Sequence, residues 1–245
     1  MPRLDKSDSQ THQVGGGFQF SAIRPEELGA SEYTLVTLVV DTTASVEEFR
    51  DDLLAAVQAA VGGCRHSPRA DHLLLRLLTF NTTRSEIHGF RPVSDIDPAA
   101  YAPFQPAGMT ALYDAVYDAV LATNRYARLL SAQDFQVNAA LYIVTDGADN
   151  SSRVGPRHIA EELRGALREE VLASLHTVLV GINTATGTVR QHLERFRVEA
   201  GLKEFLPVSE ATPERLAALA AYVSRSVSVQ SRLLASGATA GLPGF

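Results

Sequence analysis

The sequence predicts an α/β fold, namely a doubly wound, mostly parallel six-stranded sheet with helices on both faces. Apolar segments rich in aliphatic and β-branched residues alternate along the chain with amphipathic segments of helical spacing. Most stretches between successive strands are long enough to hold a crossover helix, which parallel neighbours require. Because such crossovers are right-handed, the helices are expected to cover both faces of the sheet.

Six segments have the composition of buried strands. The first two, Thr34–Val40 and Leu73–Phe80, are dominated by aliphatic and β-branched residues, as expected of strands buried on both faces. The run Gly17–Ile23 alternates briefly between apolar and polar residues, which is consistent with one more short edge strand. In chain order the six expected strands are Thr34–Val40, Leu73–Phe80, Ile87–Phe90, Ala139–Val144, Leu175–Ile182 and Glu204–Val208.

Five segments are expected to form the covering helices. The first is expected to end at the glycine pair Gly62-Gly63, because glycine favours helix termination. The last has a clear start, with Thr212 as N-cap and Pro213 at the first helical position. In chain order the expected helices are Val46–Gly62, Thr110–Leu130, Pro156–Val171, Thr188–Ala200 and Pro213–Leu234.

The strand order expected for this pattern is 3-2-1-4-5-6. Only the short stretch Asn81–Glu86 separates the second strand from the third, and it cannot hold a crossover. The third strand is therefore expected to run antiparallel at an edge of the sheet. In this order the first and fourth strands are neighbours, and ligands bind beyond the carboxyl ends of the strands at such a switch point.

Length and composition indicate one domain. The chain has 245 residues, of which 45% are hydrophobic and 20% are charged, and a formal net charge of −6. The domain is expected to span residues 18–235, between flexible tails at residues 1–17 and 236–245. The sequence has no apolar run long enough to span a membrane, and its polar start is not expected to act as a secretory signal. The single cysteine, Cys64, favours a reducing compartment such as the cytoplasm. The mild acidity argues against nucleic acid and anionic membranes as partners.

Five oxygen-bearing side chains are predicted to meet at the switch point. Asp41 follows the first strand in VVDTTAS, and Asp146 follows the fourth in YIVTDGADN. Thr43 and Ser45 lie just beyond Asp41, and Thr110 lies where a loop enters the second helix. Carboxylates mixed with neutral hydroxyls suit a hard cation such as Mg²⁺. Two carboxylates leave such an ion able to attract one more carboxylate from outside, so the set indicates ligand binding rather than water activation.

These residues resemble the metal-ion-dependent adhesion site (MIDAS) of von Willebrand factor A (VWA) domains. The family pattern is D-x-S-x-S, then a distant Thr, then Asp, and its five places are filled here by Asp41, Thr43, Ser45, Thr110 and Asp146. The resemblance implies a metal site for Mg²⁺, or for Mn²⁺ or Ca²⁺, and a protein partner that presents Asp or Glu to the metal. Within the family, the sequence is similar to the intracellular bacterial type found in stress-response and tellurite-resistance gene clusters. The resemblance implies a binding or scaffold module rather than an enzyme, and it predicts no oligomeric state.

Two departures from the family pattern bear on metal binding. Thr43 stands where Ser is usual, which keeps the hydroxyl but adds a methyl group and stiffens χ1. Met109 stands where related bacterial sequences commonly have Gly. A structural domain with a vestigial metal site is therefore one alternative.

A metal-dependent phosphohydrolase of the haloacid dehalogenase-like (HAD) type is a second alternative, because it also places Asp after its first strand. Its pattern resembles D-x-D, however, and Thr43 holds the place of the second acid. It also needs a lysine before the last acidic turn, and neither Lys6 nor Lys203 fits that order. These two departures favour the binding module.

Several residues also have ordinary structural interpretations. Asp146-Gly147 is a common turn pair, and Thr110 is expected to cap a helix as well as to bind metal. Asp149 is expected to face solvent. Cys64 is expected to be a packed thiol, and Thr42 has no predicted role.

Overall fold

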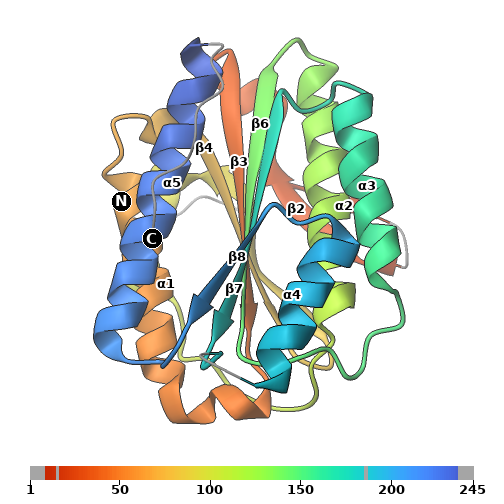
Figure 1. Cartoon of the computed structure of the whole chain (residues 1–245). Coiled ribbons are helices and arrows are strands. Elements are labelled where there is room, and N and C mark those ends of the chain that lie inside the picture. The colour runs from red at the N-terminus through yellow and green to blue at the C-terminus, as the bar shows by residue number, and fades with distance from the viewer. Residues whose placement is uncertain (1–8, 15–16, 185–186, 237–245) are drawn as a thin grey trace.

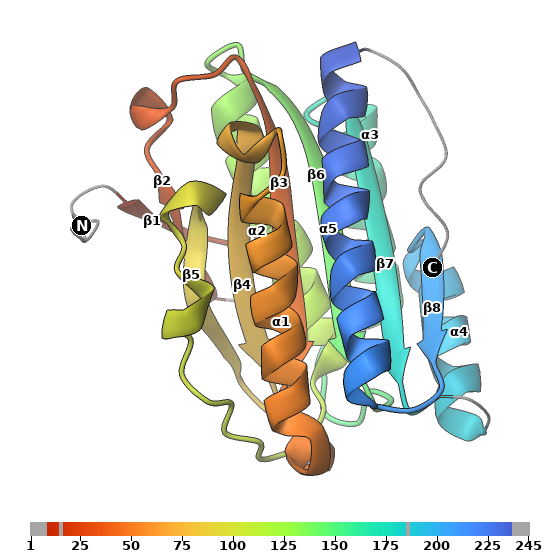
Figure 2. The ribbon, with the colours of Figure 1, turned by 90° about the vertical axis from the view of Figure 1, so that its left-hand side faces the viewer.

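The computed structural model describes residues 9–14, 17–184 and 187–236. A single twisted sheet runs through the centre of the molecule between two layers of helices (Figure 1). Its strands are β1 (Ser9–Gln13), β2 (Gln19–Ile23), β3 (Glu32–Asp41), β4 (Leu73–Phe80), β5 (Arg84–Pro92), β6 (Gln136–Thr145), β7 (Ser174–Ile182) and β8 (Glu204–Val208). Their order across the sheet is β1-β2-β5-β4-β3-β6-β7-β8, which can be followed in Figure 2.

The six expected strands correspond to β3 through β8 and keep their expected relative order, with β5 antiparallel to β4. The expected number of six strands is wrong, because β1 and β2 form an antiparallel hairpin and β2 pairs with β5 through Ala22 and Phe90. It follows that β5 is not an edge strand. The predicted flexible segment 1–17 contains β1, whose side chains are largely exposed, so its polar sequence carried no strand signal. The predicted tail 236–245 lies outside the described residues apart from Ser236.

A buried ion pair attaches this hairpin to the sheet. Arg76 of β4 is fully buried, and its Nε donates a hydrogen bond of 2.7 Å to Glu86 of β5. The other carboxylate oxygen of Glu86 accepts hydrogen bonds from the backbone N–H and the hydroxyl of Ser21 in β2. The rings of Phe18 and Phe20 lie over the Arg76 guanidinium, at 5.5 and 5.9 Å. The charge on one strand is thus stabilised by groups from two others.

Helices cover the two faces of the sheet unequally. Figures 1 and 2 show α1 (Arg50–Arg65) and α5 (Pro213–Ser236) side by side on one face. The opposite face is covered by α2 (Leu112–Ser131), α3 (Pro156–Arg168) and α4 (Thr188–Ala200). Each face has its own apolar core, and the side chains of β3 and β6 alternate between the two.

Helix α1 differs from its prediction at both ends. Its expected first turn is a separate 3-10 helix, Ala44–Phe49, and α1 continues past Gly62-Gly63 to Arg65. A Cβ atom on Gly63 would lie 2.6 Å from the Cβ atom of Ser224 in α5. The glycine therefore allows close contact between two helices and does not end one.

No helix of the described residues is long and apolar enough to cross a membrane.

The single cysteine lies in the interior of the protein. Cys64 of α1 is buried in the core on that helix's side of the sheet, and burial raises the pKa of its thiol to about 12. The prediction of a packed thiol is confirmed.

Candidate metal centre

Two of the predicted carboxylates lie at the carboxyl ends of adjacent parallel strands. β3 pairs with β6 in a register that places Val40 opposite Val144, so Asp41 and Asp146 both emerge at the same edge of the sheet. Asp41 is 1% exposed, whereas Asp146 is only partly buried. An aspartate at 1% exposure requires partners, and its hydrogen bonds identify them.

Both oxygens of Asp41 accept hydrogen bonds. Oδ1 accepts from the backbone N–H of Thr43 at 2.8 Å, which folds the chain back immediately after β3. Oδ2 accepts from the hydroxyl of Thr145 at 2.6 Å, and this bond joins β3 to the end of β6. The carboxylate is therefore fixed in orientation before any ligand arrives.

The hydroxyls of the 41–45 loop connect this carboxylate to the second one. The Thr43 and Ser45 hydroxyl oxygens are 3.1 Å apart and share a hydrogen bond. The Ser45 hydroxyl donates to Asp146 Oδ1 at 2.8 Å. A continuous set of hydrogen bonds thus links four of the five predicted site residues, from Asp41 through Thr43 and Ser45 to Asp146.

Thr110, the fifth residue, is placed by the loop that follows β6. Its backbone N–H donates to the Asn150 side chain at 2.8 Å, and its carbonyl accepts from the Asn150 N–H at 2.9 Å. A Cβ atom on Gly147 would lie 3.5 Å from the Thr110 hydroxyl oxygen. This hydroxyl therefore lies beside the turn that carries Asp146.

The N-terminus of α2 is capped from this same loop, which contradicts two expectations. Ala111 rather than Thr110 occupies the N-cap position, and it makes no side-chain cap. The Asp149 carboxylate accepts a hydrogen bond from the Tyr113 N–H at 3.2 Å. The Ser152 hydroxyl accepts one from the Asp114 N–H at 3.0 Å. The prediction that Asp149 faces solvent is therefore wrong, because the free N–H groups of a helix N-terminus attract a carboxylate.

Burial makes the two site carboxylates reluctant to ionise. Desolvation raises the pKa of Asp41 to about 6, against the opposing effect of hydrogen bonds from Thr145 and Thr43, and the nearby Asp146 raises it further. Desolvation also raises the pKa of Asp146, while the Ser45 hydroxyl acts in the opposite direction. Two carboxylates at this edge are held where their charges lack full compensation, which a cation between them would supply.

The residues present fit a hard divalent cation. Carboxylate and hydroxyl oxygens are the ligands that Mg²⁺ prefers, and Mg²⁺ commonly retains several waters. Among the residues that the structure describes, there is no group of three or more His, Cys, Asp and Glu that could hold a metal. A metal at Asp41 and Asp146 would therefore depend on the hydroxyls of the 41–45 loop and on water.

Two residues around the centre have roles that sequence reasoning missed. Thr145 holds Asp41, and it lies immediately before Asp146, so its place in the TDG stretch was the available signal. Thr42, which had no predicted role, donates its hydroxyl to the carbonyl of Phe80 at 3.0 Å and so ties the 41–45 loop to β4.

The side chain of Met109 does not fill the centre. It is 54% exposed, and its backbone N–H donates to the hydroxyl of Thr82 at 2.8 Å. The preceding Gly108 has a φ of 75°, so the special backbone conformation of this loop falls on the glycine. A methionine is tolerated at position 109 because its side chain points into solvent.

The sequence matches no protein-family model and no curated protein. Solved structures do match the fold. The D319A mutant of the PilB minor pilin from Streptococcus sanguinis superposes with a TM-score of 0.58 at 14% identity, over 93% of this chain and 68% of that one. The ArnB paralog VWA2 from Sulfolobus acidocaldarius gives a TM-score of 0.52 at 11% identity, over 80% of this chain and 45% of that one.

A third similar structure is described with a metal. Proximal thread matrix protein 1 (PTMP1) from the mussel byssus, with a zinc-occupied MIDAS motif, gives a TM-score of 0.51 at 16% identity over 83% of this chain. This chain spans about half of that protein, 47% of its length. At these identities the similarity shows a shared VWA-type fold.

Proposed function

We propose that this chain, which has a VWA-type fold, is a metal-dependent protein-binding module. A divalent cation held by Asp41, Thr43, Ser45, Thr110 and Asp146 captures an aspartate or glutamate of a partner protein. The observation that carries this proposal is the hydrogen-bonded set of oxygens between β3 and β6, with two carboxylates whose pKa values are raised. Two carboxylates neutralise a divalent ion, and neutral hydroxyls and waters leave it able to accept one more carboxylate.

Binding is favoured over hydrolysis by the character of position 43. The hydroxyl of Thr43 is engaged with Ser45, and it cannot act as the second acid that a HAD-type phosphohydrolase uses beside its nucleophile. The proposal therefore includes no catalytic step. Two observations favour this proposal over the vestigial alternative: the exposed Met109 side chain leaves the centre clear, and hydrogen bonds link Asp41, Thr43, Ser45 and Asp146.

The solved structures support the proposal in general terms. PTMP1 is described with zinc in its MIDAS motif, which supports a divalent ion at the matching place here. Mg²⁺ rather than zinc is the ion we propose, because the donors are all oxygens and none is cysteine or histidine. A cytoplasmic location and a relationship to the bacterial VWA proteins of stress-response and tellurite-resistance clusters are further parts of the proposal.

Thermal unfolding with and without metal tests the site. Mg²⁺ or Mn²⁺ at about 100 times its Kd should stabilise the protein by about 2.7 kcal/mol, which corresponds to a Tm rise of roughly 5–10 °C in a domain of this size. Asp41→Ala and Asp146→Ala should abolish this rise. Asp71→Ala removes the same charge from an exposed position before β4, at the opposite end of the sheet, and should leave the rise unchanged.

Partner capture is tested separately. Immobilised protein should retain an acidic partner in Mg²⁺ and release it in EDTA, and Asp146→Ala should retain none under either condition. A protein whose Tm does not respond to metal would support the vestigial alternative. Phosphatase activity that disappears in Asp41→Asn would instead support the hydrolase.

A further inference from the structure

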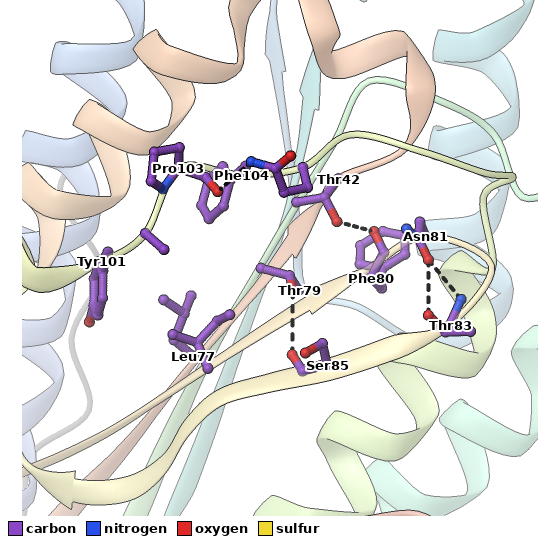
Figure 3. A pocket seen from close by; sticks show the side chains of 13 residues that line it. Thr42, Leu77, Thr79, Phe80, Asn81, Thr83, Ser85, Tyr101, Pro103 and Phe104 are labelled. Atoms are coloured by element: carbon purple, nitrogen blue, oxygen red, sulfur yellow. Dashed lines mark hydrogen bonds between the residues drawn. The ribbon is translucent and has the colours of Figure 1, made fainter.

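A pocket lies next to the candidate metal centre and shares a backbone segment with it. Its volume is about 300 Å³, and its walls come from the end of β4, the start of β5 and the loop of residues 101–105 (Figure 3). Thr42, which lies between Asp41 and Thr43, lines it on one side. A molecule bound at the metal and a group in this pocket would therefore be neighbours.

Hydrogen bonds connect the wall of the pocket to the metal loop. The N–H of Thr42 donates to the carbonyl of Phe80 in β4 at 2.8 Å. The carbonyl of Thr42 accepts from the N–H of Ala107, immediately beyond the 101–105 loop, at 3.0 Å. Thr42 thus links β4 and the segment after the 101–105 loop, so hydrogen bonds connect the pocket directly to the metal centre.

The lining of the pocket is uncharged throughout. Its apolar part includes Leu77, Tyr101 and Phe104, and its polar part consists of hydroxyl and amide groups such as those of Thr79 and Asn81. An anion would find no cationic side chain here, and an ammonium group would find no carboxylate. The chemistry suits a bulky neutral group, and the volume is at the lower limit of small-molecule sites, enough for one large side chain.

Ile87 is a large apolar residue that lines this pocket and is exposed to solvent. It lies at an irregularity in the β4–β5 pairing, between the pairs Leu77–His88 and Leu78–Glu86, so it has no partner residue in the ladder. Its side chain is 45% exposed and lines the pocket. Bulges commonly redirect a side chain beside a functional site, and here the apolar surface of Ile87 is available to a group that enters the pocket.

We infer that this pocket receives a bulky uncharged side chain, aromatic or aliphatic, from the same partner segment whose carboxylate binds the metal. The inference rests on the proposed function and adds the partner's chemistry to it. An extended peptide advances about 3.5 Å per residue, so the neutral residue should lie within a few positions of the acidic one. The partner motif is therefore an Asp or Glu with a large neutral residue at a constant offset.

Selection from a displayed library of random peptides, in Mg²⁺ and in EDTA, tests this motif. Mg²⁺-dependent binders should share both the acid and the large neutral residue. Ala102→Trp, at an exposed position that lines the pocket, should weaken these peptides roughly tenfold or more. Ala100→Trp, at an exposed position just before this loop and outside the pocket, should change affinity less than about twofold. Both variants should keep the Mg²⁺-dependent rise in Tm, which shows that the metal centre is intact.

The outcomes separate this inference from the proposed function. Peptides that carry the acid without a neutral residue at a constant offset, or that bind Ala102→Trp normally, would overturn the inference and leave the metal-dependent capture standing. A selection that gives the same peptides in EDTA as in Mg²⁺, or none in either, would overturn the proposed function and the inference with it. A selected peptide with its neutral residue changed to Gly should bind the wild type and Ala102→Trp equally.

Discussion

Replacement of Asp41 by Asn separates the charge of the buried carboxylate from its shape. The Asn side chain can keep both hydrogen bonds, because its Oδ1 can accept from the Thr43 N–H and its amide can donate to the Thr145 hydroxyl. That hydroxyl then donates to the Gly147 carbonyl, which lies 3.1 Å away. The substitution therefore removes a charge with little change in packing. We expect Asp41→Asn to stabilise the metal-free protein and to abolish its response to Mg²⁺.

The magnitude follows from the pKa of Asp41. Burial raises this pKa from 3.8 to about 6, and two pKa units correspond to about 3 kcal/mol. Asp41 binds its proton more tightly in the folded wild-type protein than in the unfolded chain. Its protonation therefore stabilises the fold fully below pH ~4, and this contribution is lost as pH rises through ~6. At pH 7.5 in EDTA, Asp41→Asn should therefore be more stable by up to about 3 kcal/mol. The difference should shrink at pH 5.

Urea unfolding in EDTA at the two pH values, and again with Mg²⁺, measures this effect. Asp114→Asn is the matched control, since Asp114 is a buried aspartate outside the metal set that accepts hydrogen bonds from the N–H groups of Arg153 and Val154. It should lose about 1 kcal/mol with or without metal and keep the Mg²⁺ response. If Asp41→Asn destabilises the metal-free protein as Asp114→Asn does, or if Mg²⁺ still stabilises it, the reasoning about this centre is wrong.

Three further predictions concern residues around the centre and the core. Glu86→Gln removes the carboxylate that pairs with the buried Arg76 guanidinium and should cost about 3–5 kcal/mol in urea unfolding. The double variant Arg76→Met, Glu86→Leu should recover most of this loss, and equal instability of the two variants would refute the explanation. Burial lowers the pKa of His176 to about 4. As pH falls from ~6.5 to ~4 the unfolded chain binds a proton at this histidine before the folded protein does, so the free energy of unfolding should decrease by up to about 3 kcal/mol. His176→Gln should reduce this pH dependence, and an unchanged dependence would show that another group causes it. Met109→Gly should alter the Mg²⁺-dependent stabilisation by less than about 1 kcal/mol because the side chain is exposed, and a larger gain would show that Met109 impedes the metal.

Local sequence was sufficient for the central strands and for the place of the two site aspartates. Strands such as β3 are recognised by their own apolar composition, and parallel neighbours necessarily present their carboxyl ends at one edge of the sheet. The position of Asp41 immediately after β3, and of Asp146 immediately after β6, follows from those strands alone. The hydroxyls of Thr43 and Ser45 then follow by their closeness in the chain.

Contacts between distant segments decided the rest. The polar strand β1 is held by backbone pairing with β2, and β2 is in turn held by hydrogen bonds from Ser21 to Glu86 of β5. The residues of β1 themselves reveal neither of these contacts. Asp149 lies where it does because the loop after β6 passes over the free N–H groups of α2. The sequence by itself determined which side chains could form the centre. Only the tertiary structure decided that Thr145 holds Asp41, that burial raises its pKa, and that an uncharged pocket lies beside it, because each depends on groups brought together from separate strands and loops.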